Sequence, residues 1–368
     1  MKRLGFIVLT LMLFFLLSVS AGATGEIDSF KQQTEESFFE SIDSELGSLL
    51  EDFGINSFDG EQIFDEGSKN IGRYFSVTLK QKLSDAVSWF FSGVCIIMLI
   101  SIISSAFEFS FSVDALNIFS AAIISIVTVG KISSFINCTL SAMALNGKFM
   151  LSFIPVFALL ISLSGNPASA LTYNSFLLFF CEAISFFLEN IYLSVIRIYF
   201  SLCVAFSFNP TVNLSRFING ANRITSLALG TSATAFTSLL SVKNVLAVSA
   251  DSLSVKGVRF LLSSLVPVIG SSLSEAYSSV LGSINLMKSS VAVVGIFALV
   301  IINIPALTEG VVYFFLMTVL SCLAEIIGLY RVAEIYRGLA SCVRNLLLVS
   351  VFHTFVLIIS IGIMLTLK

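Results

Sequence analysis

Residues 260–279 read FLLSSLVPVIGSSLSEAYSS. The first part is apolar enough for a membrane, yet Pro267, Gly270 and Glu275 interrupt it and serines surround them. A span that faces only lipid gains nothing from these residues, because every backbone polar group in hydrocarbon must find its partner within the protein. The stretch therefore predicts a helix that is broken at membrane depth, where protein or water satisfies the freed backbone groups.

The composition places this stretch in a membrane protein. Hydrophobic residues make up 56% of the 368 positions, charged residues only 12%, and the mean hydropathy is +0.98. Soluble domains carry about 25% charged residues. We therefore expect an all-α polytopic integral membrane protein, since helices satisfy their own backbone in lipid.

Several apolar runs have the length of roughly 20 residues that a transmembrane helix needs. We expect seven or eight crossings in total. The runs are Val87–Phe107, Val113–Phe135, a pair within Thr172–Phe208, Val291–Ala306, Val311–Leu329 and Leu346–Leu367.

Two further apolar segments, 149–163 and 260–270, are shorter, and each ends near a Pro-Val step. Pro155 aligns with Pro267, so the pair predicts two broken, re-entrant segments that enter the membrane from opposite sides. Coincidence between two simple apolar strings is the alternative. As a candidate structural or permeation motif the sequence offers Pro155, Pro267, Gly270, Ser274, Glu275 and Lys288.

The N-terminus has the pattern of a secretory signal peptide. Lys2 and Arg3 precede an apolar run, and the small residues Ala21 and Ala23 follow it directly. We expect residues 1–23 to be removed by cleavage after Ala23, and residues 24–86 to form an exported segment. An uncleaved first span is the alternative.

The exported segment differs from the rest in charge. Residues 24–87 contain fourteen acidic and five basic residues. A stripe of apolar residues at helical spacing, Phe30, Phe38, Ile42, Leu46, Leu49 and Phe53, predicts one or two amphipathic helices. The stripe is expected to bind a partner, or else to pack on the membrane domain of the same chain.

Basic residues in short loops favour the cytoplasmic side of a membrane. We therefore expect the loops Arg216–Arg223 and Arg331–Arg344 to be cytoplasmic. The membrane domain then divides into a first half, 87–208, and a second half, 209–368, which holds the broken-helix motif 260–307.

The residues carry no pattern typical of catalysis. The six cysteines have no C-x-x-C spacing, and no nucleophile–base constellation, phosphate-binding loop or H-E-x-x-H motif occurs. His353, which is the only histidine, is expected to be a helix-packing donor rather than a metal ligand. We expect no enzyme activity, no cofactor and no metal.

The stretch from Leu265 to Leu307 resembles the most recognisable part of the stage III sporulation protein AE family. A similar Val-Pro-Val-x-Gly is followed by Ser-acidic-Ala, a Leu-Met-Lys turn and a Val-Gly span that ends near a proline. Glu275 stands where the family pattern suggests Asp. The matching residues are Val266, Pro267, Val268, Gly270, Ser274, Glu275, Ala276, Gly282, Leu286, Met287, Lys288, Val294, Gly295 and Pro305.

The resemblance implies a membrane subunit of a channel-like or secretion-like sporulation complex. The complex would span the space between mother cell and forespore and would be needed for late forespore development. Implied partners are other proteins of the stage III sporulation A operon, a forespore membrane partner and membrane lipid, with no nucleic acid. The implied location is the mother-cell membrane around the forespore, with the exported segment in the intermembrane space. An independent secondary transporter, with a midplane site at the paired broken helices, is the alternative.

Overall fold

The computed structural model describes residues 29–58, apart from 30, 41, 43 and 56, and residues 67–106, 113–164, 167–208, 214–234, 238 and 270–366. All regular structure in these ranges is helical, which confirms the all-α prediction for this part of the chain. Residues 31–40 and 214–234 are helical. The labelled elements are α2 (Ser44–Asp52), α4 (Ser68–Ala106), α5 (Val113–Leu163), α6 (Pro167–Phe186), the π-helix η2 (Phe187–Tyr192), α7 (Leu193–Ser207), α9 (Gly270–Ile326) and α10 (Tyr330–Thr366).

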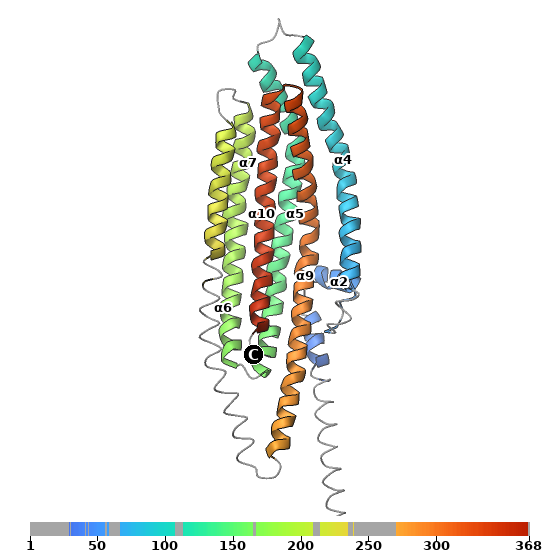
Figure 1. Ribbon diagram of the computed structural model, residues 1–368, viewed down its shortest axis with the longest axis vertical. Helices are drawn as coiled ribbons and strands as arrows, with labels where there is room; N and C mark the ends of the chain where they lie inside the picture. The colour runs from blue at the N-terminus through green and yellow to red at the C-terminus, as the bar shows by residue number, and fades with distance from the viewer. Residues whose placement is uncertain are drawn as a thin grey trace, which may run out of the picture.

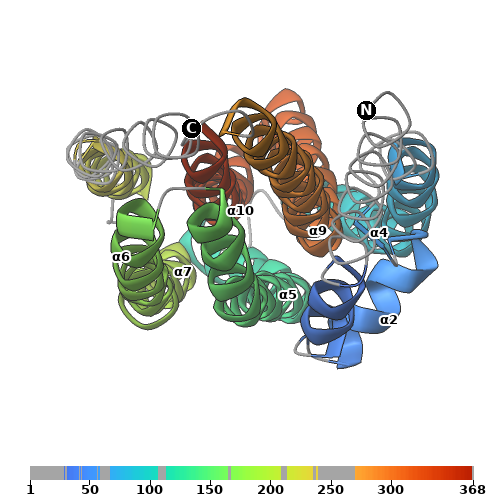
Figure 2. The same cartoon turned by 90° about the horizontal axis from the view of Figure 1, so that it is seen from below.

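The long helices form an elongated bundle (Figure 1). Helix α9 packs on α10, α5 and α4, while α10 also packs on α5 and α7. Seen from below, α4 and α2 lie at one edge of the bundle and α6 with α7 at the other (Figure 2). The α9–α10 pair and α5 therefore form the centre on which the other helices pack.

Within the described part of the chain, five helical segments are long and apolar enough to cross a membrane: 68–105, 118–163, 174–207, 281–326 and 330–365. At a rise of about 1.5 Å per residue, the 57 residues of α9 extend about 85 Å, whereas the hydrocarbon core of a bilayer is about 30 Å thick. The shortest of the five segments, 174–207, has 34 residues and extends about 50 Å, so each of these candidate spans is longer than the hydrocarbon core.

Seven or eight separate crossings are not found in the described residues. The predicted span 113–135 and the short segment 149–163 belong to one helix, α5, and the spans 291–306 and 311–329 belong to α9. The pair predicted within 172–208 is likewise continuous through the π-helix η2. Polar residues between two apolar runs indicated loops, but tertiary contacts bury many of them and the helix continues.

Pro155 does not break its helix, so the predicted re-entrant segment at 149–163 is wrong. The proline lies inside α5 with its side chain exposed. It removes one backbone hydrogen bond, and the neighbouring Phe153 and Phe157, both fully buried, hold the helix on either side. Pro267 and the predicted signal peptide, residues 1–23, lie outside the described residues.

The turn between α9 and α10 follows from one glycine. Gly328 has φ +86°, and its N–H donates to the Glu325 carbonyl at 3.1 Å. The N–H of Leu329 donates to the Ala324 carbonyl at 2.9 Å. These two bonds form a Schellman motif, which ends α9 and allows α10 to run back along it.

Two glycines of α9 let it approach its neighbours closely. A Cβ added at Gly295 would lie 2.6 Å from the Phe153 ring of α5. One at Gly310 would lie 2.5 Å from Leu347 of α10 and 2.6 Å from Phe135 of α5. Small residues at such contacts are typical of helices that associate in membranes, where dispersion contacts rather than water exclusion drive packing.

The replacement Gly310→Leu should therefore separate α9 from α5 and α10. We expect a cost of about 1–3 kcal/mol or more from overpacking, seen as a lower melting temperature of the detergent-purified protein. Gly282→Leu is the matched control, because nothing lies within 4 Å of a Cβ there. Equal melting temperatures for the two variants would contradict the close-packing role.

The apolar stripe of the segment predicted to be exported packs on the long helices of the same chain. Phe38 and Leu46 are fully buried, and the Phe38 ring lies 6.4 Å from Phe149 and 6.2 Å from Phe153 of α5. Phe53 packs edge-on against Tyr74 of α4 at 5.0 Å. The alternative of self-packing is thus the one observed, and the stripe is not available to a partner. Phe30 lies outside the described residues.

The replacement Phe38→Asp would place a carboxylate among buried rings without a cation. We expect much lower abundance and a lower melting temperature. Ser37→Asp introduces the same charge at the neighbouring, exposed position and should leave both unchanged. Normal abundance of Phe38→Asp together with loss of a co-purifying protein would instead favour partner binding.

Candidate functional site

A polar cavity of about 590 Å³ lies where α4, α5 and α9 meet. Four ionisable side chains besides tyrosine line it: Lys82 and Asp85 of α4, Lys131 of α5 and Glu309 of α9. Ser84, Ser88, Ser134 and Tyr313 add hydroxyl groups. Ionisable residues within membrane helices are rare and typically face a bundle interior or a water-filled cavity, which makes this the leading candidate site.

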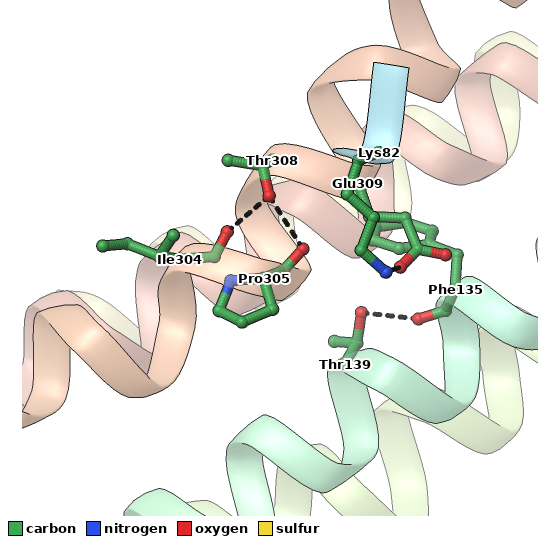
Figure 3. A network of polar contacts seen from close by, with 7 residues as sticks. All are labelled: Lys82, Phe135, Thr139, Ile304, Pro305, Thr308 and Glu309. Carbon is green, nitrogen blue, oxygen red and sulfur yellow. Dashed lines mark hydrogen bonds and ion pairs between the residues drawn. The ribbon is translucent and has the colours of Figure 1, made fainter. Parts of the chain in front are cut away.

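Lys82 and Glu309 form an ion pair at the centre of this site. Their Nζ and Oε2 atoms are 2.5 Å apart, although the residues are 227 positions apart in sequence (Figure 3). The Glu309 side chain is 5% exposed and that of Lys82 is 30% exposed. A buried carboxylate needs such a cation, because desolvating an unpaired charge costs several kcal/mol, or about the stability of a small domain.

Hydroxyl groups support the helices beside the pair (Figure 3). Thr308 Oγ1 donates to the carbonyls of Ile304, at 2.7 Å, and Pro305, at 3.0 Å. Across the interface, Thr139 Oγ1 donates to the Phe135 carbonyl at 2.9 Å. These bonds satisfy the hydroxyls internally, so two polar residues are accommodated in the turns around Pro305 and Phe135 without exposure to water.

A second cavity, of about 500 Å³, lies further along the same three helices. Tyr74, Ser141 and Lys148 supply its polar lining, and Leu49 of α2 lies at its wall. On α5 and α9 the lining residues of the first cavity are 127–134 and 309–313, and those of the second are 138–148 and 301–306. We call the two cavities together the α4 seam; the Lys82–Glu309 pair lies between α4 and α9 within it.

A separate cluster of polar side chains connects the helices at the centre of the bundle. Asn146 of α5 and Asn303 of α9 exchange two hydrogen bonds, at 3.1 and 3.3 Å. His353 of α10 has its Nδ1 3.5 Å from Asn146 Nδ2 and its Nε2 3.5 Å from the Ser185 hydroxyl of α6. The two asparagines and the histidine are fully buried. His353 thus has the helix-packing role that the sequence predicted.

The predicted motif residues are not brought together at the α4 seam. Gly270 begins α9, and Ser274 and Glu275 lie in its first turns, where their side chains are not described. Lys288 is buried in α9, but it lies 21 residues before Glu309, or about 30 Å along the helix. The motif therefore remains a hypothesis about the start of α9.

The sequence reasoning missed the residues that form the site. Neither Lys82 nor Glu309 was among the candidate residues predicted from the sequence. A signal was present, because Asn303 and Glu309 lie within the largely apolar stretch 291–329, and such residues tend to have partners on neighbouring helices. Only the tertiary structure shows that Asn146 is the partner of Asn303 and Lys82 the partner of Glu309.

The basic regions around Arg216 and Arg331 lie next to each other, as expected if they share one side of the membrane. Arg331 Nη2 donates to the Phe206 carbonyl at 2.8 Å, and the Ser215 hydroxyl donates to Glu334 at 2.9 Å. Both regions are helical rather than loops, so the prediction of loops is wrong. This contact is the observation that supports the prediction that the two basic regions lie on the same side of the membrane.

Exchanging the charges tests the ion pair. Lys82→Glu places two carboxylates together and Glu309→Lys two ammonium groups, so each single variant should lower the melting temperature. The double variant should recover much of the loss, because coupled charges in contact are non-additive. Glu325→Ala removes one member of the half-exposed Arg337–Glu325 pair and should have little effect, as surface pairs contribute about 0–1 kcal/mol. Additive losses in the double variant would contradict the pairing.

The described fold and its buried ion pair define an all-α membrane protein whose polar residues lie between its helices. Residues 46–367 match the family model described as stage III sporulation protein AE, and the chain belongs to that family. The family predicted from residues 265–307 is thereby confirmed.

A curated relative, stage III sporulation protein AE of Bacillus subtilis (strain 168), is 23% identical over 180 residues. The aligned region covers 49% of this chain and 45% of the relative, so the match spans about half of each protein. No solved structure matches the chain.

Proposed function

We propose that the protein is a membrane subunit of a sporulation complex that connects the mother cell with the forespore and is needed for late forespore development. The observation that carries the proposal is the family match over residues 46–367, which includes all five candidate membrane helices. The proposed partners are the other proteins of the stage III sporulation A operon and a protein of the forespore membrane. The proposed location is the mother-cell membrane around the forespore, with the exported segment in the intermembrane space.

The role proposed is structural and channel-related rather than enzymatic. The ionisable and amide side chains of the bundle, such as Lys82 with Glu309 and Asn146 with Asn303, join one helix to another. In membrane helices this use of polar side chains stabilises a particular packing. The family also bears the name of a sporulation protein.

Within the complex, we propose that the α4 seam is the contribution of this chain to a conduit. Helix α4 packs mainly on α9 and α5, at the edge of the bundle. The seam provides hydroxyls and both signs of charge to a hydrated solute, which suits a path for polar molecules.

Deleting the gene tests the sporulation role. We expect normal vegetative growth, development blocked after engulfment and loss of late forespore gene expression. A tagged, functional copy should recover the operon partners from sporulating cells. Normal sporulation with loss of solute uptake during growth would instead favour the independent transporter.

Bulky side chains test the conduit in the same strain. Ser88→Trp and Ser134→Trp fill the first cavity and should reduce spore yield at normal protein level. Val87→Trp is the control, since Val87 is adjacent to Ser88, partly exposed and not part of the lining. Full spore yield for both serine variants would overturn the conduit while leaving the sporulation role intact.

A further inference from the structure

Another polar cavity lies outside the α4 seam, between the 214–234 helix, α9 and α10. Its volume is about 290 Å³, far above the roughly 10–15 Å³ that accommodates one water. Arg337 and Arg344 of α10 and Asn219 and Asn222 of the 214–234 helix line it, and none of the described lining residues is acidic. The cavity therefore differs in charge from the first cavity of the seam, which two lysines and two acidic residues line.

The two arginines are placed to act on one ligand. They are seven residues apart, so they lie on the same face of α10, about 10 Å apart along its axis. Arg344 is exposed, and its Nη2 lies 3.4 Å from the Ser341 hydroxyl. The Arg337 partner, Glu325, is half exposed like Arg337 itself, and such a pair contributes little stability. Both guanidinium groups can thus donate to a bound anion.

The asparagine at the cavity wall is oriented by its neighbours. The Oδ1 atom of Asn222 accepts from the Ser341 hydroxyl at 2.7 Å and from Asn345 Nδ2 at 3.0 Å. Because both bonds use the oxygen, the amide nitrogen of Asn222 is directed elsewhere as a donor. Asn219, one turn earlier, is exposed and adds a second amide. The site therefore combines two cationic and two neutral hydrogen-bond donors.

The surroundings of the cavity are apolar. Phe314 and Ile218 form part of its wall. Cys322 of α9 and Ala340 of α10 are further apolar lining residues. Donors for an anion beside an apolar wall match a ligand with a charged head and a hydrocarbon body.

We propose that this cavity binds a phosphate group through Arg337, Arg344, Asn219 and Asn222. Guanidinium groups pair with phosphate oxygens through two parallel N–H bonds, which gives the pairing both strength and orientation. The phosphate can belong to the headgroup of an anionic phospholipid or to free inorganic phosphate. The site is independent of the proposed conduit and of the sporulation role.

The test uses the full chain in a neutral detergent. Its melting temperature is followed during titration with phosphatidylglycerol, with diacylglycerol of the same acyl chains, and with sodium phosphate against sodium chloride at equal ionic strength. Stabilisation by phosphatidylglycerol and not by diacylglycerol identifies a lipid headgroup. Stabilisation by phosphate over chloride identifies the free anion.

The replacement Arg344→Gln should raise the half-saturating ligand concentration about tenfold or more, as expected for losing a charge-assisted hydrogen bond. Arg223→Gln is the matched control, because Arg223 is an exposed arginine on the neighbouring helix and does not line the cavity. Asn219→Asp, an exposed change that brings a negative charge to the cavity, should weaken binding in the same way.

Three results would overturn the proposal. One is the absence of any stabilisation by phosphatidylglycerol or phosphate over their controls. The second is an equal loss in Arg344→Gln and Arg223→Gln, which would indicate attraction to general positive charge. The third is unchanged binding by Asn219→Asp in a protein whose melting temperature without ligand equals that of the wild type.

Discussion

The close approach of α9 to α5 and α10 is the constraint on which the rest of the structure depends. Gly295 and Gly310 leave no room for a side chain at these contacts, and the Gly328 turn returns α10 along α9. In lipid, apolar surfaces gain little from avoiding solvent, so the closeness of packing decides which helices associate. The buried polar residues of α9 can meet their partners only because the helices are this close.

Polar residues then give the bundle its specific arrangement. Asn303 pairs with Asn146, and Glu309 pairs with Lys82. Each of these groups would be costly if buried without its partner. If α9 rotated about its axis and kept apolar contacts, both polar pairings would still be lost. The two pairings therefore select one rotation of α9 from several that apolar packing alone would allow. The same charged pair connects the edge of the bundle to its centre, because it joins α4 to α9.

The N-terminal helical segment contributes to the same core instead of extending from it. Its rings pack on Phe149 and Phe153, and Asn70 donates to the Phe53 carbonyl at 3.2 Å. The segment thereby covers one end of α5 and borders the second cavity through Leu49. Among the described acidic residues of the segment, Glu36, Glu40, Glu51 and Asp52 are exposed and provide its solvated side.

The sequence by itself determined the class of the protein, its family and the helical nature of its described parts, because composition and local apolar runs reflect the demands of lipid on any chain. It also determined that His353 would serve helix packing and that most of the N-terminal apolar stripe would lie on helices. Tertiary structure alone decided that α5 passes through Pro155 and that α9 joins two apolar runs, since packing on both sides offsets one missing hydrogen bond. It alone decided the partner of Glu309. Lys82 is 227 residues away, and local patterns contain no information about which of several distant cations a fold will bring to a buried carboxylate.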